Sequence, residues 1–401
     1  MAEGGGDPRA VFRIRLLNQI ATAGLARLPA GRYLTGADVD EPDALLVRSA
    51  DLHGTAIPPS VRAVARAGAG TNNIPVAALS GRGVPVFIAP GANANAVKEL
   101  VLAGMLMAAR NLAPALDFVA RLDAGASDLE QQVEAGKKAF AGTELAGQTL
   151  GIIGLGRVGC LVADAAIRLG MQVWGFDPEI TVDAAWSLPS QVRRAASVEE
   201  VLRHGHFISL HVPLVTATRG LVGKDNIDLV PPGAVLLNFS REGVVDDTAV
   251  LAALQGGGLG WYVCDFPGAA ILRHPRIVAL PHLGASTREA EENCAVMVAE
   301  QLRDFLENGN VVHAVNFPDV SLPRESDFRV AIANANVPNM LGQISTAMAR
   351  AGLNIHTMVN KSRGEMAYTL VDVDSAVPAG ALAELQAIAG VLSVRYLPRF
   401  D

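Results

Sequence analysis

The sequence predicts an α/β chain whose centre is a doubly wound parallel sheet. Short apolar runs alternate with helical stretches through the middle of the chain. Half of the 401 residues are hydrophobic and 18% are charged, so the chain can bury several large cores. Alternation of this kind is typical of parallel strands joined by right-handed crossovers.

The central sheet is predicted from six apolar runs. Helices are expected between them at residues 158–169 and 248–254, and Ser197 with Glu200 has the capping-box spacing of another helix start. The predicted strands are residues 150–153, 172–176, 206–210, 234–239, 261–263 and 276–280.

The first ninety residues show a weaker alternation, with strands expected at 44–47, 63–65 and 84–88. They predict a smaller, flavodoxin-like α/β domain. Long helices expected at 95–110 and 289–306 flank the central sheet. We infer that the chain leaves the first domain, builds the second and returns, so that residues 8–94 and 289–318 form one domain and 95–288 the other.

Residues 309–326 carry Gly309, Pro318, Pro323 and mixed charges, which is typical of a linker. Residues 328–401 follow with the order strand, helix, strand, strand, helix, strand, which is a βαββαβ ferredoxin-like plan. The strands are expected at 329–333, 354–359, 366–372 and 391–397, and the helices at 341–351 and 379–388.

Composition excludes several classes. Lys plus Arg number 33 and Asp plus Glu 40, a net charge of −7, which argues against a nucleic-acid or anionic-membrane binder. Cys160, Cys264 and Cys294 lack CxxC spacing, so no metal site is expected and a reducing cytoplasm fits. Residues 1–10 have no signal-peptide core and are interpreted as a frayed start, and the apolar helix at 100–109 is too short to span a bilayer.

A glycine-rich turn follows the strand at 150–153 directly and opens a helix. Gly154 permits a tight turn, Gly156 lets the backbone approach a pyrophosphate, and Gly159 lets helix and strand pack closely. Asp177 lies 18 residues after Gly159, at the end of the next strand, where a carboxylate binds both ribose hydroxyls and repels a 2′-phosphate. With Glu179 nearby, the pattern predicts a Rossmann domain that binds NAD rather than NADP.

Two strand-end residues are the candidate catalytic groups, because ligands of open parallel sheets bind beyond the carboxyl ends of strands. Arg241 could grip a substrate carboxylate bidentately. His282 could exchange a hydroxyl proton while hydride moves to the nicotinamide. His211, another strand-end histidine, is interpreted as a wall of the cofactor site.

These motifs resemble the D-isomer-specific 2-hydroxyacid dehydrogenases. The resemblance covers nearly the whole chain and includes His211-Val212-Pro213, the segment 238–246 and the segment 281–286. The C-terminal βαββαβ unit resembles an ACT regulatory domain. The combination implies oxidation of 3-phospho-D-glycerate to 3-phosphohydroxypyruvate with NAD, the first step of L-serine biosynthesis, by a cytoplasmic homodimer or homotetramer.

The resemblance also implies roles for further residues. Arg241 would bind the substrate carboxylate and His282 would be the general acid/base. Substrate binding would fall to Arg48, Ser49, Asn93, Lys137 and Lys138. The remaining cofactor contacts would come from Arg157, Val158, Val212, Pro213, Thr218, Phe239, Ser240, Asp265 and Gly284.

One departure from the family pattern concerns the third catalytic group. The family carries a glutamate that pairs with the histidine, after an Asp-Val-Phe segment. Here the segment runs Cys264-Asp265-Phe266-Pro267 and has no glutamate, with Ala269 at its position. Our hypothesis is that Asp265 serves the cofactor, and that His282 works without a close partner or borrows one from elsewhere.

Several alternatives stay open. The ACT-like unit could bind L-serine through Asn334, Asn336 and Asn354, or it could only dimerise through its sheet edges. The chain could act on glyoxylate, hydroxypyruvate, lactate or 2-oxoglutarate instead. It could also be a non-enzymatic NAD-sensing protein similar to corepressors of this fold.

Overall fold

The computed structural model describes residues 11–399, which fall into two compact units. One unit comprises Ala94–Thr287 and the other comprises Met1–Asn93 with Arg288–Asp401. The interpretation of residues 1–10 as a frayed start, and the predicted start of a domain at residue 8, lie outside the described residues.

The unit Ala94–Thr287 contains a fully parallel sheet in the order β12-β11-β10-β9-β6-β7-β8. This is the doubly wound order: the strands that follow β6 in the chain first continue on one side of it, and from β9 onward they continue on its other side. The central strands are buried throughout, which explains their continuous apolar runs. The strands are β6 (Thr149–Ile153), β7 (Gln172–Phe176), β8 (Arg193–Arg194), β9 (Phe207–Leu210), β10 (Ala234–Asn238), β11 (Leu259–Cys264) and β12 (Ile277–Ala279).

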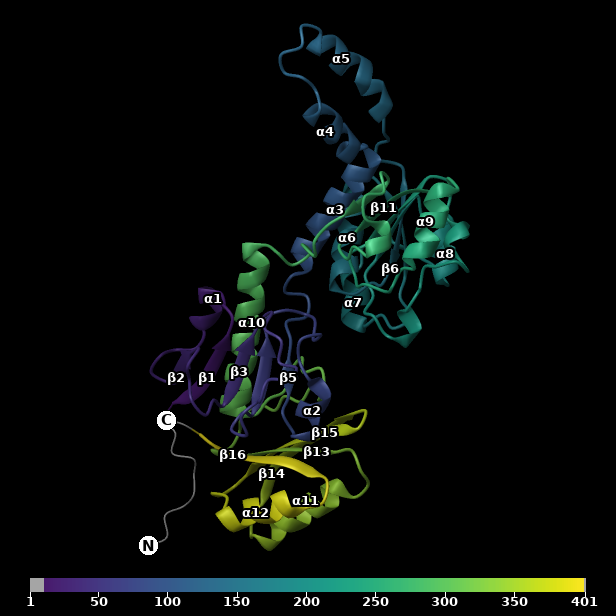
Figure 1. Ribbon diagram of the computed structural model, residues 1–401. Helices are drawn as coiled ribbons and strands as arrows, with labels where there is room; N and C mark the ends of the chain where they lie inside the picture. Colours follow the sequence, from purple (N-terminus) through teal and green to yellow (C-terminus); the bar gives the residue numbers. More distant parts are fainter. Residues whose placement is uncertain (1–10, 400–401) are drawn as a thin grey trace. The chain divides into compact units, whose positions relative to one another are not determined.

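The predicted helices of this unit are confirmed. A helical hairpin formed by α4 (Leu112–Ala120) and α5 (Leu129–Gly136) was not predicted. In Figure 1 the hairpin extends beyond the end of α3. None of its helical residues is buried. The helices are α3 (Ala94–Ala109), α4 (Leu112–Ala120), α5 (Leu129–Gly136), α6 (Arg157–Arg168), α7 (Val182–Ser187), α8 (Val198–His204) and α9 (Asp247–Gln255), with 3-10 turns η1 (Lys137–Phe140), η2 (Thr216–Thr218), η3 (Ile227–Leu229) and η4 (Ala269–Ile271).

The other unit contains a five-stranded parallel sheet in the order β2-β1-β3-β4-β5, the flavodoxin-like order. The first two strands were missed from the sequence: Arg13 and Arg15 interrupt the apolar pattern of the first, and the second has only four residues. The strands are β1 (Phe12–Leu17), β2 (Tyr33–Gly36), β3 (Ala44–Val47), β4 (Ala63–Arg66) and β5 (Val86–Phe87), and the helices are α1 (Thr22–Leu25), α2 (Val76–Gly81) and α10 (Arg288–Asn308).

A four-stranded antiparallel sheet completes this unit in the order β14-β15-β13-β16, with α11 and α12 on one face. The order and the βαββαβ succession are those of the predicted ferredoxin-like plan. The elements are β13 (Phe328–Ala335), α11 (Met340–Arg350), β14 (Ile355–Arg363), β15 (Met366–Val373), α12 (Ala379–Ala387) and β16 (Val391–Pro398).

The segment expected to be a linker is in fact packed into this unit. Val311 and Val320 form a bridge, and Phe317 and Leu322 are buried. The face of the antiparallel sheet that α11 and α12 leave uncovered shares a core with α10 and the five-stranded sheet. The prediction of a linker failed because its buried apolar residues are single and irregularly spaced.

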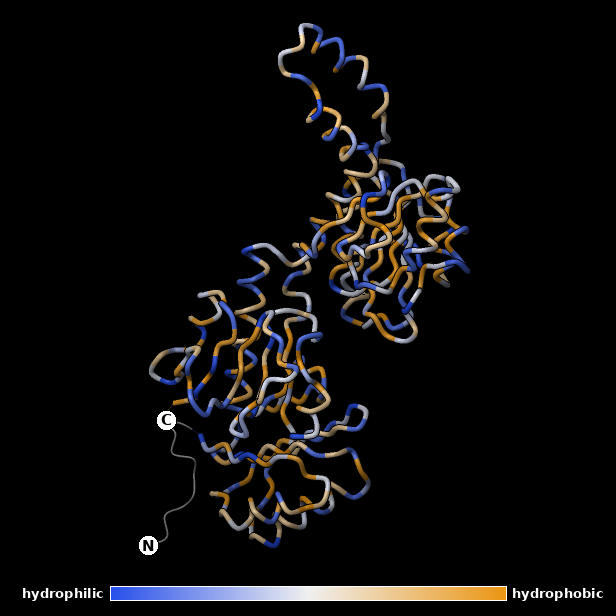
Figure 2. Tube along the Cα trace, viewed as in Figure 1, coloured by the Kyte–Doolittle hydropathy of each residue, from blue (hydrophilic) through white to orange (hydrophobic). Residues whose placement is uncertain are grey.

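Apolar residues concentrate on the central strands of both parallel sheets (Figure 2). Within residues 11–399 no single helix is long and apolar enough to cross a bilayer. α3 and α4 together reach that length and composition, but the chain bends by 69° between them.

Candidate active site

The glycine turn between β6 and α6 has the geometry of a dinucleotide site. Gly154 has a φ of +94°, and a Cβ atom there would lie 2.5 Å from the carbonyl oxygen of His211. A Cβ on Gly159 would lie 2.1 Å from the carbonyl oxygen of Gly154, whereas one on Gly156 would meet nothing within 4 Å. The open space at Gly156, at the N-terminus of α6, fits a pyrophosphate bound by free N–H groups. Arg157 and Val158 form the first turn of this helix.

Asp177 is fixed beside this turn. Its Oδ2 accepts a hydrogen bond from the Leu155 N–H at 2.8 Å, and its Oδ1 accepts one from the Glu179 N–H at 2.9 Å. Each carboxylate oxygen keeps a second lone pair, so the group is oriented and can still accept bonds from ribose hydroxyls.

The loop after β9 is held by its own polar groups. His211 Nε2 lies 2.9 Å from Ser209 Oγ, and burial lowers the pKa of His211 to about 4. The imidazole is therefore neutral at neutral pH, which suits a cofactor wall and not an acid/base group. Thr218 Oγ1 donates to the carbonyl oxygen of Pro213 and so closes the loop that follows Val212.

Arg241 follows β10 in a turn organised by Asn238. The buried Asn238 amide donates to the carbonyl oxygen of Arg241 at 3.0 Å and accepts from Ser240 Oγ at 2.8 Å. Phe239 and Ser240 are buried beneath the turn. The Arg241 guanidinium donates to the carbonyl oxygen of Ser240, and within residues 11–399 it pairs with no carboxylate. Partial desolvation lowers its pKa, so an anionic ligand would relieve an uncompensated positive charge.

Asp265 connects the loops that carry Arg241 and His282. Its N–H donates to the carbonyl oxygen of Asn238 at 3.1 Å, and its own carbonyl accepts from the His282 N–H at 3.1 Å. Its carboxylate accepts bonds from the N–H groups of Leu283 and Gly284, both at 2.7 Å. Burial raises the pKa of the Asp265 carboxyl, while those two N–H groups act against the rise. Asp265 therefore holds the turn that presents His282, a role that the sequence did not reveal.

His282 is exposed and has a φ of +56°, a left-handed conformation that is uncommon for a residue other than glycine. Its ring centroid lies 4.6 Å from that of Phe266 at an interplanar angle of 52°. In the described part of the chain no carboxylate oxygen comes within 4 Å of the imidazole. An aromatic ring thus contacts this histidine, and no acid replaces the missing glutamate there.

The predicted substrate residues are divided between the two units. Lys137 and Lys138 are exposed in the unit Ala94–Thr287, where Lys137 pairs with Glu134. Arg48, Ser49 and the half-buried Asn93 belong to the other unit.

Two asparagines that the sequence analysis did not single out hold the loop after β3. Asn18 Oδ1 accepts from the N–H groups of Ser49 and Ala50, and the Asn73 amide donates to the carbonyl oxygens of Arg48 and Ala50. The loop is therefore fixed by side chains from two neighbouring strand ends, which only the sheet order could reveal.

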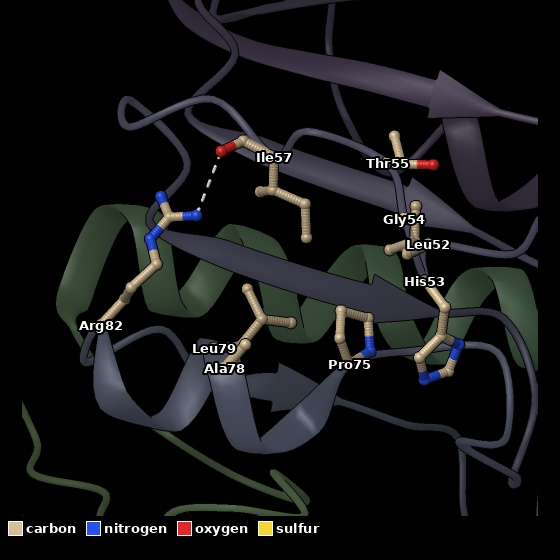
Figure 3. A pocket seen from close by; sticks show the side chains of 9 residues that line it. All are labelled: Leu52, His53, Gly54, Thr55, Ile57, Pro75, Ala78, Leu79 and Arg82. Atoms are coloured by element: carbon tan, nitrogen blue, oxygen red, sulfur yellow. Dashed lines mark hydrogen bonds between the residues drawn. The ribbon is translucent and has the colours of Figure 1, made fainter.

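A cavity of about 320 Å³ lies beside this loop (Figure 3). Its walls are largely apolar, and the Arg82 guanidinium is already bonded to the carbonyl oxygens of Ile57 and Pro58. The lining residues are Leu52, His53, Gly54, Thr55, Ile57, Pro75, Ala78, Leu79 and Arg82. None of the predicted site residues lines it.

The three candidate effector residues lie at two different places on the antiparallel sheet. Asn336 donates to the carbonyl oxygen of Gly364, after the end of β14, whereas Asn354 pairs with Asp374 at its start. Nine residues of β14 separate those ends, roughly 30 Å of strand. Asn334 is buried and donates to the carbonyl oxygen of Ala335. A single copy of the chain therefore does not bring Asn336 and Asn354 together.

Comparison with known proteins identifies the family. Residues 102–284 match the model described as D-isomer specific 2-hydroxyacid dehydrogenase, NAD binding domain. A D-3-phosphoglycerate dehydrogenase of Escherichia coli K12 is 32% identical over 341 residues, which is 82% of this chain and 79% of that protein. The chain belongs to the D-isomer-specific 2-hydroxyacid dehydrogenase family. The family prediction made from its motifs is confirmed.

Other relatives support the same assignment. A D-3-phosphoglycerate dehydrogenase of Methanocaldococcus jannaschii is 32% identical over 380 residues, covering 92% of this chain and 68% of that protein. The NAD⁺-bound 3-phosphoglycerate dehydrogenase of Entamoeba histolytica matches 76% of this chain and 99% of its own, with a TM-score of 0.60 and 24% identity. At that identity the likeness shows the dehydrogenase fold alone.

Proposed function

We propose that this 2-hydroxyacid dehydrogenase oxidises 3-phospho-D-glycerate to 3-phosphohydroxypyruvate with NAD, the first step of L-serine biosynthesis. The observation that carries the proposal is the hydrogen-bonded connection, through Asp265, of the Arg241 and His282 loops at one edge of the NAD-domain sheet. The names of the relatives support the substrate. We place the reaction in the cytoplasm and divide the chain as the sequence predicts, with residues 328–401 as an ACT-like unit.

The chain's own groups supply binding and proton transfer. Arg241 binds the substrate carboxylate, and its uncompensated charge favours that anion. His282 takes the proton of the C2 hydroxyl as general base. Gly156 and Asp177 would hold NAD, which would supply the hydride acceptor. Asp265 fixes the turn of His282 and so maintains the distance between base and hydroxyl.

The direct test is NADH absorbance with purified protein and a panel of D-2-hydroxy acids with and without a 3-phosphate. We expect NADH formation with 3-phospho-D-glycerate, a strong preference over D-glycerate and D-lactate, and little activity with NADP because of Asp177. Equal rates with glycerate and lactate would move the chain to the other 2-hydroxyacid reductases. Cofactor binding without turnover of any acid would favour the NAD-sensing alternative.

We also propose that the chain acts as a homo-oligomer regulated by L-serine at the ACT-like unit. β14 is an edge strand whose outer side pairs with nothing in the described chain. Antiparallel pairing of two β14 strands would bring Asn354 of one copy near Gly364 and Asn336 of the other. The exposed hairpin residues Leu116 and Val119 offer a second association surface.

Millimolar L-serine is therefore expected to lower the rate of the wild-type protein. Asn354→Ala should weaken the inhibition without changing the uninhibited rate, because the residue lies in the ACT-like unit. An unchanged rate in serine would leave this unit with a dimerisation role only.

A further inference from the structure

Glu291 forms an ion pair with Arg48, a residue that is expected to bind the substrate. It lies in the first turn of α10, and its Oε1 is 2.6 Å from Nη2 of Arg48. Both residues belong to the same compact unit, and their side chains are 39% and 35% exposed. The pair is thus open to solvent, and an incoming anion can compete for the arginine.

A second arginine lies against the same loop. Arg66, the last residue of β4, donates from Nε to the carbonyl oxygen of Arg48 at 3.1 Å. The Nη1 of Arg66 lies over Gly68. A Cβ atom on residue 68 would be only 2.7 Å from this nitrogen. Burial raises the pKa of the Cys294 thiol to about 11, while Arg48 and Arg66 act against the rise and Glu291 adds to it, so the three charged groups all lie near this thiol. Arg48 and Arg66 thus bring two guanidiniums to one loop, and Glu291 is bonded to the first of them.

The backbone around the cluster is fixed, but the Arg48 side chain can exchange partners. Asn18 and Asn73 hold the main chain of residues 48–50. Glu291 does not depend on Arg48 for its charge, because the N-terminal turn of a helix stabilises a carboxylate by itself. Release of Arg48 from Glu291 is therefore electrostatically tolerable.

We propose that Glu291 is a specificity-determining residue that acts as an internal counter-anion of Arg48, which the phosphate of the substrate must displace. The proposal rests on the proposed function, since it assigns the phosphate to the Arg48–Arg66 cluster. Glu291 lowers the affinity of the cluster for any dianion, because its negative charge remains nearby after the exchange. Unphosphorylated acids do not reach Arg48 and do not experience this charge.

The test replaces Glu291 by glutamine, which keeps the shape and removes the charge. We expect the KM for 3-phospho-D-glycerate to fall roughly 3- to 10-fold, with kcat and the KM values for D-glycerate and NAD unchanged. Glu289→Gln is the matched control, because Glu289 lies in the same turn, is exposed and contacts Arg288. A KM that rises or stays constant in Glu291→Gln would overturn the proposal and leave Glu291 as a scaffold of the Arg48 side chain.

A second measurement does not require turnover. Calorimetric titration with inorganic phosphate is expected to show roughly 3- to 10-fold tighter binding to Glu291→Gln than to the wild type or Glu289→Gln, and loss of binding in Arg48→Gln. Equal phosphate affinity in all four proteins would refute the counter-anion role. If phosphate binding shifts as expected but 3-phospho-D-glycerate is not oxidised, the proposed function fails while the anion site stands.

Discussion

Replacing His282 by asparagine is expected to lower kcat by roughly 10²- to 10⁴-fold, the range for loss of a general acid/base. Asparagine is the informative substitution because it tolerates the left-handed φ of +56° at this position and cannot take up the proton. The turn should survive, since Asp265 holds it through the backbone N–H groups of residues 283 and 284. The KM for NAD and the thermal midpoint should therefore change little.

The matched control is His274→Asn in the same unit, because His274 lies before β12 and its Nδ1 accepts a hydrogen bond from the Arg276 N–H. It should leave kcat unchanged. A kcat that is equally insensitive to both substitutions would remove His282 from the proton transfer. The contact with Phe266 adds a further readout: Phe266→Leu should loosen the imidazole and lower kcat modestly while Asp265 still fixes the main chain.

The predicted NAD-domain site rests on local rules, which a sequence carries on its face. Gly154, Gly156 and Gly159 each have the steric environment that their spacing requires. Arg241 and His282 were singled out because the carboxyl ends of neighbouring parallel strands share one edge of a sheet, and β10, β11 and β12 are such neighbours. The absence of the family's glutamate partner for His282 could also be seen in the sequence, since residues 264–270 contain no glutamate.

The rest depended on contacts between residues far apart in the chain. The pairing of Arg48 with Glu291 joins positions 243 residues apart, and Arg66 had no motif to distinguish it from a surface arginine. Asp265 was expected to face the cofactor, but the bonds from Leu283 and Gly284 become visible only when β11 and β12 are adjacent. Residues 309–326 looked like a linker because their buried apolar residues are single and irregularly spaced.

Replacing Arg329 by methionine is expected to cost roughly 3–5 kcal/mol of unfolding free energy in the unit that contains the ACT-like sheet. Arg329 and Asp372 are both fully buried and form a bidentate pair, with Nε–Oδ1 at 2.6 Å and Nη2–Oδ2 at 2.8 Å. The same guanidinium donates to the carbonyl oxygens of Asn308, Leu322 and Pro323. Methionine would leave the buried Asp372 carboxylate without its cationic partner and would remove the donor of three carbonyl groups.

These bonds connect the first strand of the ACT-like sheet to the end of α10 and to the segment 309–326, so their loss should also loosen that attachment. The three tryptophans, Trp174, Trp186 and Trp261, all lie in the other unit. Their fluorescence reports the NAD domain during urea unfolding, and circular dichroism reports the whole chain. The double variant Arg329→Met with Asp372→Leu should recover part of the loss, because no unpaired charge stays buried. If Arg329→Met costs less than about 1 kcal/mol, or if the double variant loses the sum of both single effects, the pair does not hold the ACT-like unit in place.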